Sequence, residues 1–269
     1  MSRPPTTVEL RKTACDLAQL GATEAKRWLG KVTASRKSDN TPVTEADHAA
    51  QEAILYHLAH RFPDHAILVE EDVAKPLRHE SIQQTDYCWL IDPIDGTRNF
   101  ARGVRLFAVS VAVLHQGRPV ACAIYDATTD MIYSASSDEG AFRGNEPMVL
   151  ADRPIESDAT VAISSFRKRS IPPAVRAWMD HYLFRNHGSV ALHLAWVAAG
   201  LLDAAYTLEC KLWDAAAGAL LIEMAGGRIT NHNGAPLWPL NLADYANEDI
   251  PLLAGTPTLH SALLESLRS

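Results

Sequence analysis

Two stretches near the start of the chain have the hydrophobic spacing of amphipathic helices. Apolar residues recur every three or four positions from Val8 to Leu29, and again from Glu45 to Phe62. The polar stretch between them, Thr33 to Pro42, indicates a mobile loop. Thr44 and Asp47 have the spacing of a capping box, which predicts that the second helix begins directly after Thr44.

Short apolar runs bounded by turn residues then predict a set of strands. The expected strands are Ala66–Val69, Tyr87–Ile91, Phe107–His115, Pro119–Asp126 and Met131–Ser136. The last three form an antiparallel meander, and Gly140 to Asn145 is interpreted as a turn-rich connection. Acidic residues follow the first two strands, so carboxylates are expected at strand ends.

Beyond about residue 150, strands and helices alternate, which predicts a second, layered α/β lobe. The expected elements are a strand at Thr160–Ser164, helices at Pro173–Leu183 and Val190–Ala199, a strand at Asp203–Leu208, a helix at Asp214–Ala225, a short strand, a strand at Pro251–Ala254 and a last helix to Leu267. We therefore expect one compact unit with an N-terminal α+β lobe, residues 1–150, and a C-terminal α/β lobe, residues 151–269.

The charge balance narrows the classes of partner. A net charge of −7 and a pI of about 5.9 argue against broad binding to nucleic acid or membrane surfaces. An anionic substrate stays possible, because divalent cations reverse the local sign of an acidic site. The N-terminus has no apolar signal region, and the four separated cysteines (Cys15, Cys88, Cys122 and Cys210) are expected to be free thiols, so we expect a cytoplasmic protein.

The segment Asp92-Pro93-Ile94-Asp95-Gly96-Thr97 carries the main candidate chemistry. Two carboxylates at the end of an apolar strand converge on one small volume if the chain turns between them. Pro93 restricts such a turn and Gly96 allows close backbone approach. If Gly96 and Thr97 open a helix, its free N–H groups suit a phosphate, and hard oxygen ligands suit Mg²⁺. The alternative is an acidic turn in which an aspartate caps the backbone.

Two further acidic positions strengthen the metal hypothesis. Glu70 follows a strand, and Asp214 follows Trp213 at the start of a helix. Taken singly, Glu70 is as readily a solvated charge and Asp214 a helix N-cap. Together, however, four carboxylates at element ends would repel each other strongly unless cations lie between them.

Several short motifs of the chain also resemble those of a known protein family. These motifs are Thr44-Glu45-Ala46-Asp47, Val69-Glu70-Glu71, Trp89 to Phe100, Gly188-Ser189, Leu212 to Gly218 and Glu223 to Gly227. In this order and spacing, over about residues 5 to 265, the sequence resembles the inositol monophosphatase superfamily of lithium-sensitive, Mg²⁺-dependent phosphatases. The resemblance implies an alternating αβαβα sandwich and a homodimer. It also implies hydrolysis of a small-molecule phosphate ester, namely the phosphate monoester of a small alcohol.

The resemblance also assigns site roles. The implied ligands of two or three Mg²⁺ ions are Glu70, Asp92, the Ile94 carbonyl, Asp95 and Asp214. Glu70 is one candidate for activating the attacking water, and Thr97 hydrogen-bonded to Asp47 is the other. The N–H groups of Gly96 and Thr97 would hold the phosphate. Lys37 resembles a lysine that orders the third metal. Helix capping for Asp47 and a solvated loop position for Lys37 are the alternatives.

Substrate choice is expected in the second lobe, with Gly188 and Ser189 as possible contacts. In inositol phosphatases a glutamate seven positions before the tryptophan-linked aspartate binds inositol hydroxyls, and here that position is Thr207. We expect Glu209, two residues later, to point away from the face of Thr207. This change weakens a specific assignment to inositol monophosphate.

Other functions remain open. The run from Arg98 to Arg102 resembles some histidinol-phosphate phosphatases, although both arginines also suit exposed or intersubunit positions. A 3′(2′),5′-bisphosphate nucleotidase or sugar bisphosphatase of the same fold needs a further pocket. A metal-free binding module would be favoured by loss of an acidic ligand, and none is lost. His187 and His193 have no metal-ligand spacing and are interpreted as satisfied or surface histidines.

Overall fold

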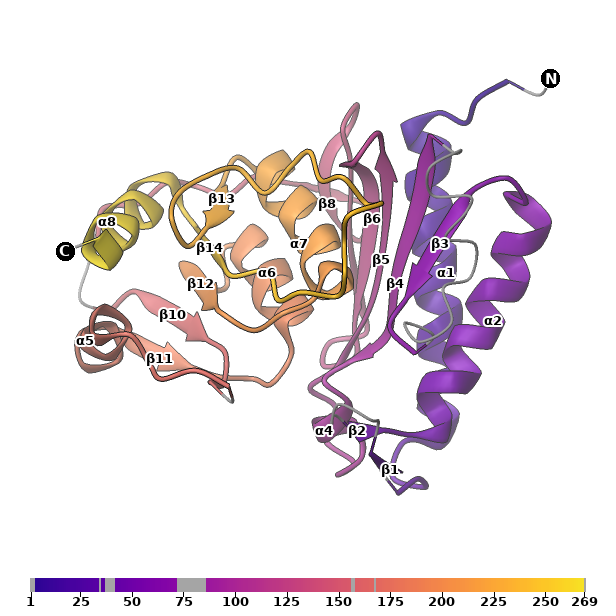
Figure 1. Ribbon diagram of the computed structural model, residues 1–269, viewed down its shortest axis with the longest axis horizontal. Coiled ribbons are helices and arrows are strands. Elements are labelled where there is room, and N and C mark those ends of the chain that lie inside the picture. The colour runs from indigo at the N-terminus through magenta and orange to yellow at the C-terminus, as the bar shows by residue number, and fades with distance from the viewer. Residues whose placement is uncertain are drawn as a thin grey trace.

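The fold is an alternating stack of helices and sheets. The computed structural model describes residues 3–33, 35–36, 42–71, 86–155, 158–166 and 168–268. Figure 1 shows α1 and α2 against one sheet, α6 and α7 between the two sheets, and α5 and α8 on the outside of the second sheet. The αβαβα sandwich is therefore confirmed.

The first layer consists of two capped helices. α1 is Thr7–Trp28 and α2 is Glu45–Arg61, close to the predicted bounds. Asp47 Oδ2 accepts the Thr44 backbone N–H at 2.8 Å, so the predicted capping box is present. Within the stretch predicted as a loop, β1 (Ser35–Arg36) and β2 (Pro42–Val43) pair antiparallel. Lys37 lies outside the described residues.

The first sheet has the order β3-β4-β5-β6-β7-β8-β9 in the part of the chain that the structure describes. Its strands are β3 Ala66–Val69, β4 Tyr87–Asp95, β5 Ala108–His115, β6 Arg118–Asp126, β7 Met131–Ser136, β8 Gly140–Arg143 and β9 Glu146–Met148. β3 and β4 are parallel, and all other neighbours are antiparallel.

Two predictions for this sheet were wrong. The residues from Gly140 to Asn145 are not only a connection, because Gly140–Arg143 is a strand that pairs with β7 and then with Glu146–Met148. The second predicted strand does not end at Ile91 but continues to Asp95. In both cases sheet pairing, which is a tertiary interaction, extends the strands beyond what the local hydrophobic pattern indicates.

The second sheet has the order β11-β10-β12-β14-β13 among the described residues. Its strands are β10 Thr160–Ile163, β11 Leu183–Arg185, β12 Ala204–Thr207, β13 Arg228–Asn231 and β14 Leu252–Gly255. β10 runs parallel to both β11 and β12, so these three strands end at one edge. The predicted helix at Pro173–Leu183 is shorter, because α5 is Pro173–His181 and Leu183 begins β11.

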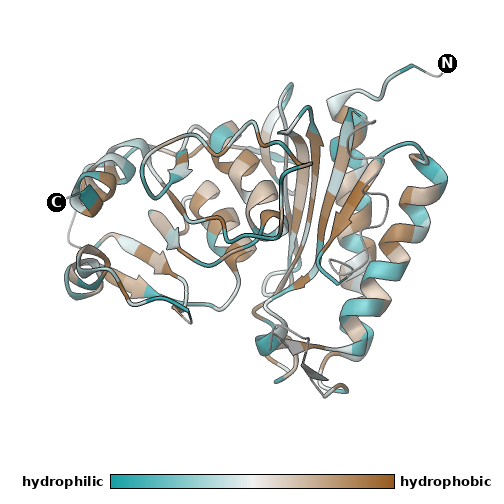
Figure 2. Ribbon diagram, viewed as in Figure 1, coloured by the Kyte–Doolittle hydropathy of each residue, from teal (hydrophilic) through white to brown (hydrophobic). Residues whose placement is uncertain are grey.

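The helices α6 (Val190–Ala198) and α7 (Leu212–Ala225) form the middle layer. Both are apolar on nearly all sides, as the tan and brown ribbons in Figure 2 show, because each faces a sheet on either side. α8 is Pro257–Arg268. No described helix is both long and apolar enough to cross a bilayer. All four cysteines are free. The lobe boundary at residue 150 stays a prediction.

Gly218 controls the approach of the two middle helices. A methyl group on Gly218 would lie 2.3 Å from Cβ of Leu194 on α6, where no side-chain rotation relieves the overlap. Gly218→Ala is therefore expected to lower the free energy of unfolding by about 1–3 kcal/mol. The helix propensity of alanine opposes this by only about 1 kcal/mol. Urea unfolding measures the difference, and a gain in stability would show that close contact is not required.

Candidate metal centre

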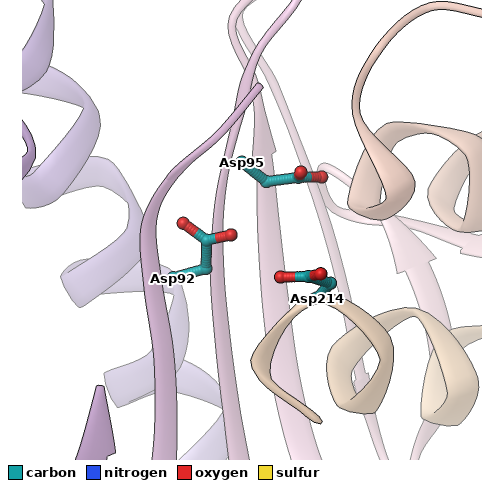
Figure 3. A group of neighbouring side chains, drawn as sticks. All are labelled: Asp92, Asp95 and Asp214. Atoms are coloured by element: carbon teal, nitrogen blue, oxygen red, sulfur yellow. The ribbon is translucent and has the colours of Figure 1, made fainter. Parts of the chain in front are cut away.

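Three aspartates meet between the first sheet and the middle helices. Asp92 and Asp95 come from β4, and Asp214 comes from the first turn of α7. One carboxylate oxygen from each lies within 4.8 Å of the others. Figure 3 shows the carboxylates of Asp92 and Asp95, from the strand, and of Asp214, from the start of the helix, gathered near one another. The structure thus brings together three of the predicted carboxylates.

A bulge in β4, not a turn, puts Asp92 and Asp95 on one face. Residues three apart on a regular strand point to opposite faces. Asp92 pairs with Ser110 and Asp95 pairs with Ala108, so β4 has three steps where β5 has two. The extra residue restores a common direction for the two side chains. The predicted convergence is correct, but the predicted turn between the two residues is wrong.

The cluster is electrostatically unfavourable without a cation. Burial raises the pKa of Asp92 well above its usual value, and the charges of Glu70, Asp95 and Asp214 raise it further. Burial likewise raises the pKa of Asp214, with Asp95 and Glu70 adding to the effect. Charged forms of these buried groups are therefore penalised, and a nearby cation would relieve the penalty.

Asp95 is tied to α6 as well as to the cluster. Its Oδ2 accepts the Ser189 hydroxyl and the Ala191 N–H, both at 2.6 Å. Burial raises the pKa of Asp95 to about 6, and these hydrogen bonds act in the opposite direction. Ser189 also accepts the Leu192 N–H at 3.1 Å as the N-cap of α6. The buried Ser189 hydroxyl thus orients Asp95, a role that sequence reasoning missed because the two residues are 94 positions apart.

Gly188 allows the turn that precedes α6. Its φ is +75°, a left-handed conformation that favours glycine, and an added methyl group would lie 2.9 Å from Asn99 Nδ2. That nitrogen donates to the His187 carbonyl at 2.7 Å. Gly188 therefore shapes the segment that carries Ser189, and its expected contact with substrate stays a prediction.

Asp214 is inside α7 rather than at its N-cap. The helix begins at Leu212, two residues earlier than predicted, and Lys211 occupies the N-cap position. Asp214 Oδ2 accepts the Lys211 N–H at 2.8 Å. The N-cap alternative for Asp214 was therefore wrong, although its carboxylate does satisfy a backbone donor of the first turn.

Glu70 lies next to the aspartate cluster. It follows β3, and its backbone N–H donates to the Ile91 carbonyl at 3.2 Å, which continues the pairing with β4. It is not one of the three residues whose oxygens lie within 4.8 Å, but its charge raises the pKa of each of them. Its role as a ligand stays a prediction.

Thr97 and Asp47 meet beside the cluster. The Thr97 hydroxyl lies 3.3 Å from Asp47 Oδ1 and 3.0 Å from the Ile94 carbonyl oxygen, so its single proton has two acceptors. Asp47 Oδ2 accepts from Thr44. Asp47 therefore caps α2 with one oxygen and faces Thr97 with the other, so the two interpretations of this residue are compatible.

Gly96 opens the short helix α4 (Thr97–Phe100) with a left-handed φ of +102°. A side chain here would place its Cβ 2.8 Å from the Leu106 carbonyl oxygen, so only glycine fits. As predicted, Gly96 and Thr97 begin a helix, and the first N–H groups of a helix lack partners within it.

The second-lobe candidates lie at the end of β12. The expectation that Glu209 faces away from Thr207 was wrong, because residues two apart on a regular strand share a face, and the strand itself stops at Thr207. Thr207 is buried, and its hydroxyl accepts the Glu209 N–H at 3.2 Å. Glu209 Oε1 accepts the N–H groups of Lys168 and Arg169. Glu209 thus holds the segment at 168–169.

His193 is a satisfied core histidine, as interpreted from the sequence. It is 2% exposed, and its Nε2 accepts the His187 N–H at 3.0 Å. Burial lowers the pKa of His193 to about 3, with a smaller contribution from His187.

Acidification is expected to destabilise the protein through His193. The unfolded chain protonates this histidine near pH 6.5, whereas the folded chain keeps it neutral. Stability is therefore lost as the pH falls below about 6.5, by about 2 kcal/mol at pH 5. Urea unfolding of the wild type and of His193→Gln at pH 7.5 and pH 5 isolates this contribution. Equal pH dependence in both proteins would contradict it.

Carboxylate oxygens gathered in one buried volume are the donor set that a hard divalent cation such as Mg²⁺ prefers, so the residues fit such an ion. The layered fold and this site define an α/β sandwich protein with a buried acidic cluster, suited to a divalent cation, against its middle helices. The chain belongs to the inositol monophosphatase family, whose model matches residues 7–269.

Known relatives agree with this family. An inositol-1-monophosphatase of Bacillus subtilis is 32% identical over 259 residues, which cover 90% of this chain and 94% of the relative. A protein of Pasteurella multocida named Nus factor SuhB is 35% identical over 205 residues, 74% of each chain. The crystal structure of extragenic suppressor protein SuhB from Bartonella henselae superposes with a TM-score of 0.84 at 26% identity, covering 97% of this chain and 98% of that one.

Proposed function

We propose that this chain hydrolyses phosphate monoesters of small alcohols and uses Mg²⁺ as its cofactor. Membership of the inositol monophosphatase family supports a phosphatase of this fold. The observation that carries the proposal is the meeting of carboxylate oxygens from Asp92, Asp95 and Asp214 within 4.8 Å. Buried acidic groups in this arrangement favour a cation rather than a metal-free scaffold.

Asp92, Asp95 and Asp214 would hold the metal, with Glu70 and the Ile94 carbonyl as further ligands for two or three ions. Mg²⁺ at such a site supplies positive charge that polarises phosphoryl oxygens and lowers the pKa of water. The Ile94 carbonyl accepts from Thr97, and a carbonyl oxygen has a second lone pair with which it could bind a cation.

The chain's own groups then orient the reactants. The Thr97 hydroxyl, held between Asp47 and the Ile94 carbonyl, can accept a hydrogen bond from water while its proton turns to Asp47 Oδ1. Glu70 is the second candidate for receiving the proton of the attacking water. The N–H groups of Gly96 and Thr97 would hold phosphate oxygens in line with it.

We infer that the alcohol lies against the end of β12, where Thr207 is uncharged and Glu209 is engaged by the backbone at 168–169. Inositol monophosphate is the first candidate, since one relative is named inositol-1-monophosphatase. The engaged carboxylate of Glu209 gives less support to the cationic histidinol phosphate.

Phosphate release in the presence of Mg²⁺ tests the function. Inositol, histidinol, sugar and nucleotide phosphates are compared at equal concentration, with Asp95→Asn as the inactive control. We expect release from inositol or another uncharged alcohol phosphate, and inhibition by Li⁺. Release that never exceeds the control would favour a binding module without catalysis.

A further inference from the structure

The first turn of α7 carries Asp214 but lacks a conventional cap. Its N-cap residue is Lys211, whose side chain has donors only and accepts nothing from the helix. Serine, threonine, aspartate or asparagine is usual at this position. Helix ends fray, whereas the proposed metal site requires Asp214 in this turn to stay close to Asp92 and Asp95.

Tyr245 takes the place of the missing cap from a distant segment. Its hydroxyl accepts the N–H of Leu212, the first residue of the helix, at 3.1 Å, and donates to the Glu248 carbonyl at 3.3 Å. The same segment is fixed again where the Ile250 N–H donates to the Cys210 carbonyl at 2.7 Å. Lys211 Nζ forms an ion pair with Asp249 at 3.0 Å.

Ser110 restrains the same turn from the side of the first sheet. It is fully buried, and its hydroxyl donates to the Trp213 carbonyl at 3.0 Å. In the β4–β5 register Ser110 is also the direct partner of Asp92. Ser110 thus pairs with Asp92 in the sheet and also holds Trp213, the residue directly before Asp214.

We propose that Ser110 and Tyr245 are positioning residues of the metal centre, which fix the first turn of α7 and thereby the Asp214 carboxylate. This inference rests on the proposed metal function. The two hydrogen bonds end on Leu212 and Trp213, the two residues before Asp214. Because the three aspartates repel each other, a loosened turn moves Asp214 away and weakens cation binding.

The test compares Ser110→Ala, Tyr245→Phe and the double variant with the wild type. Calorimetry of Mg²⁺ and Mn²⁺ binding to the metal-free full chain gives the affinity, and phosphate release gives kcat and KM. Each single variant is expected to bind metal about 2- to 10-fold more weakly, the effect of one lost hydrogen bond. With saturating metal, KM is expected to be unchanged.

Two matched variants lie on β7, which β5 and β6 separate from β4. Tyr133→Phe removes a hydroxyl that has no hydrogen-bond partner among the described residues, and Ser136→Ala removes a hydrogen bond to Glu139. Both are expected to bind metal as the wild type does. If Ser110→Ala does not fold, Ser110→Cys, which keeps a weak donor, replaces it.

The outcomes separate the two proposals. If the wild type binds metal and both Ser110→Ala and Tyr245→Phe bind it equally well, these residues serve stability alone and the positioning role is wrong. If the wild type binds neither Mg²⁺ nor Mn²⁺, the proposed metal site is wrong, and so is the positioning role that depends on it.

Discussion

Asp95→Asn is expected to lower kcat by about a thousandfold or more, since loss of a charged metal ligand removes several kcal/mol of transition-state stabilisation. The fold should survive. The asparagine carbonyl can still accept the Ser189 hydroxyl and the Ala191 N–H, which Asp95 Oδ2 accepts now. Phosphate release and far-ultraviolet circular dichroism measure the two parts of this expectation.

The matched control for this variant is Asp126→Asn. Asp126 is a buried carboxylate outside the cluster, and it accepts the Thr128 N–H, the Thr129 hydroxyl and the Trp196 indole N–H. The control is expected to lose stability and keep Mg²⁺-dependent activity. Near-normal turnover in Asp95→Asn would reject the proposed metal centre.

Removal of divalent metal is expected to abolish turnover and to lower the thermal midpoint of the wild type. Without a cation, burial penalises the charged Asp92 and Asp214, as their raised pKa values indicate. A ligand at a hundred times its dissociation constant stabilises a folded protein by about 2.7 kcal/mol.

Chelation followed by a Mg²⁺ titration, read by phosphate release and by calorimetric melting, measures both effects. Asp95→Asn serves as the comparison, and its midpoint should respond little to Mg²⁺. A wild-type midpoint that is the same with and without Mg²⁺, together with activity in excess chelator, would show that no divalent metal is needed.

Long periodic patterns predicted the first two helices well, whereas some of the short strands were missed. The helices α1 and α2 were expected within one residue of their observed bounds, because 17 to 22 residues of periodic burial leave little ambiguity. β11 has three residues and β8 has four, and each depends on pairing with a strand elsewhere in the chain. Such tertiary pairing has no local signal.

In the site, too, the features with a local sequence signal were predicted, and those that depend on tertiary contacts were not. The convergence of Asp92 and Asp95 was expected, while the bulge that causes it depends on the register with β5. The link from Ser189 to Asp95 spans 94 positions, and that from Ser110 to Trp213 spans 103. No spacing rule connects residues so far apart, so the supporting contacts could be found only in three dimensions.

The engagement of Asp95 Oδ2 has a consequence for ion selectivity. Two hydrogen bonds, from Ser189 and Ala191, already engage this oxygen, so at the proposed site Asp95 would bind a cation through Oδ1, as a monodentate ligand. A small octahedral ion with single-oxygen ligands and bound waters, such as Mg²⁺, tolerates that restriction. Ca²⁺, which commonly takes bidentate carboxylates and a larger coordination number, would lose a ligand. Anchoring of α6 would therefore favour the smaller ion at the proposed site.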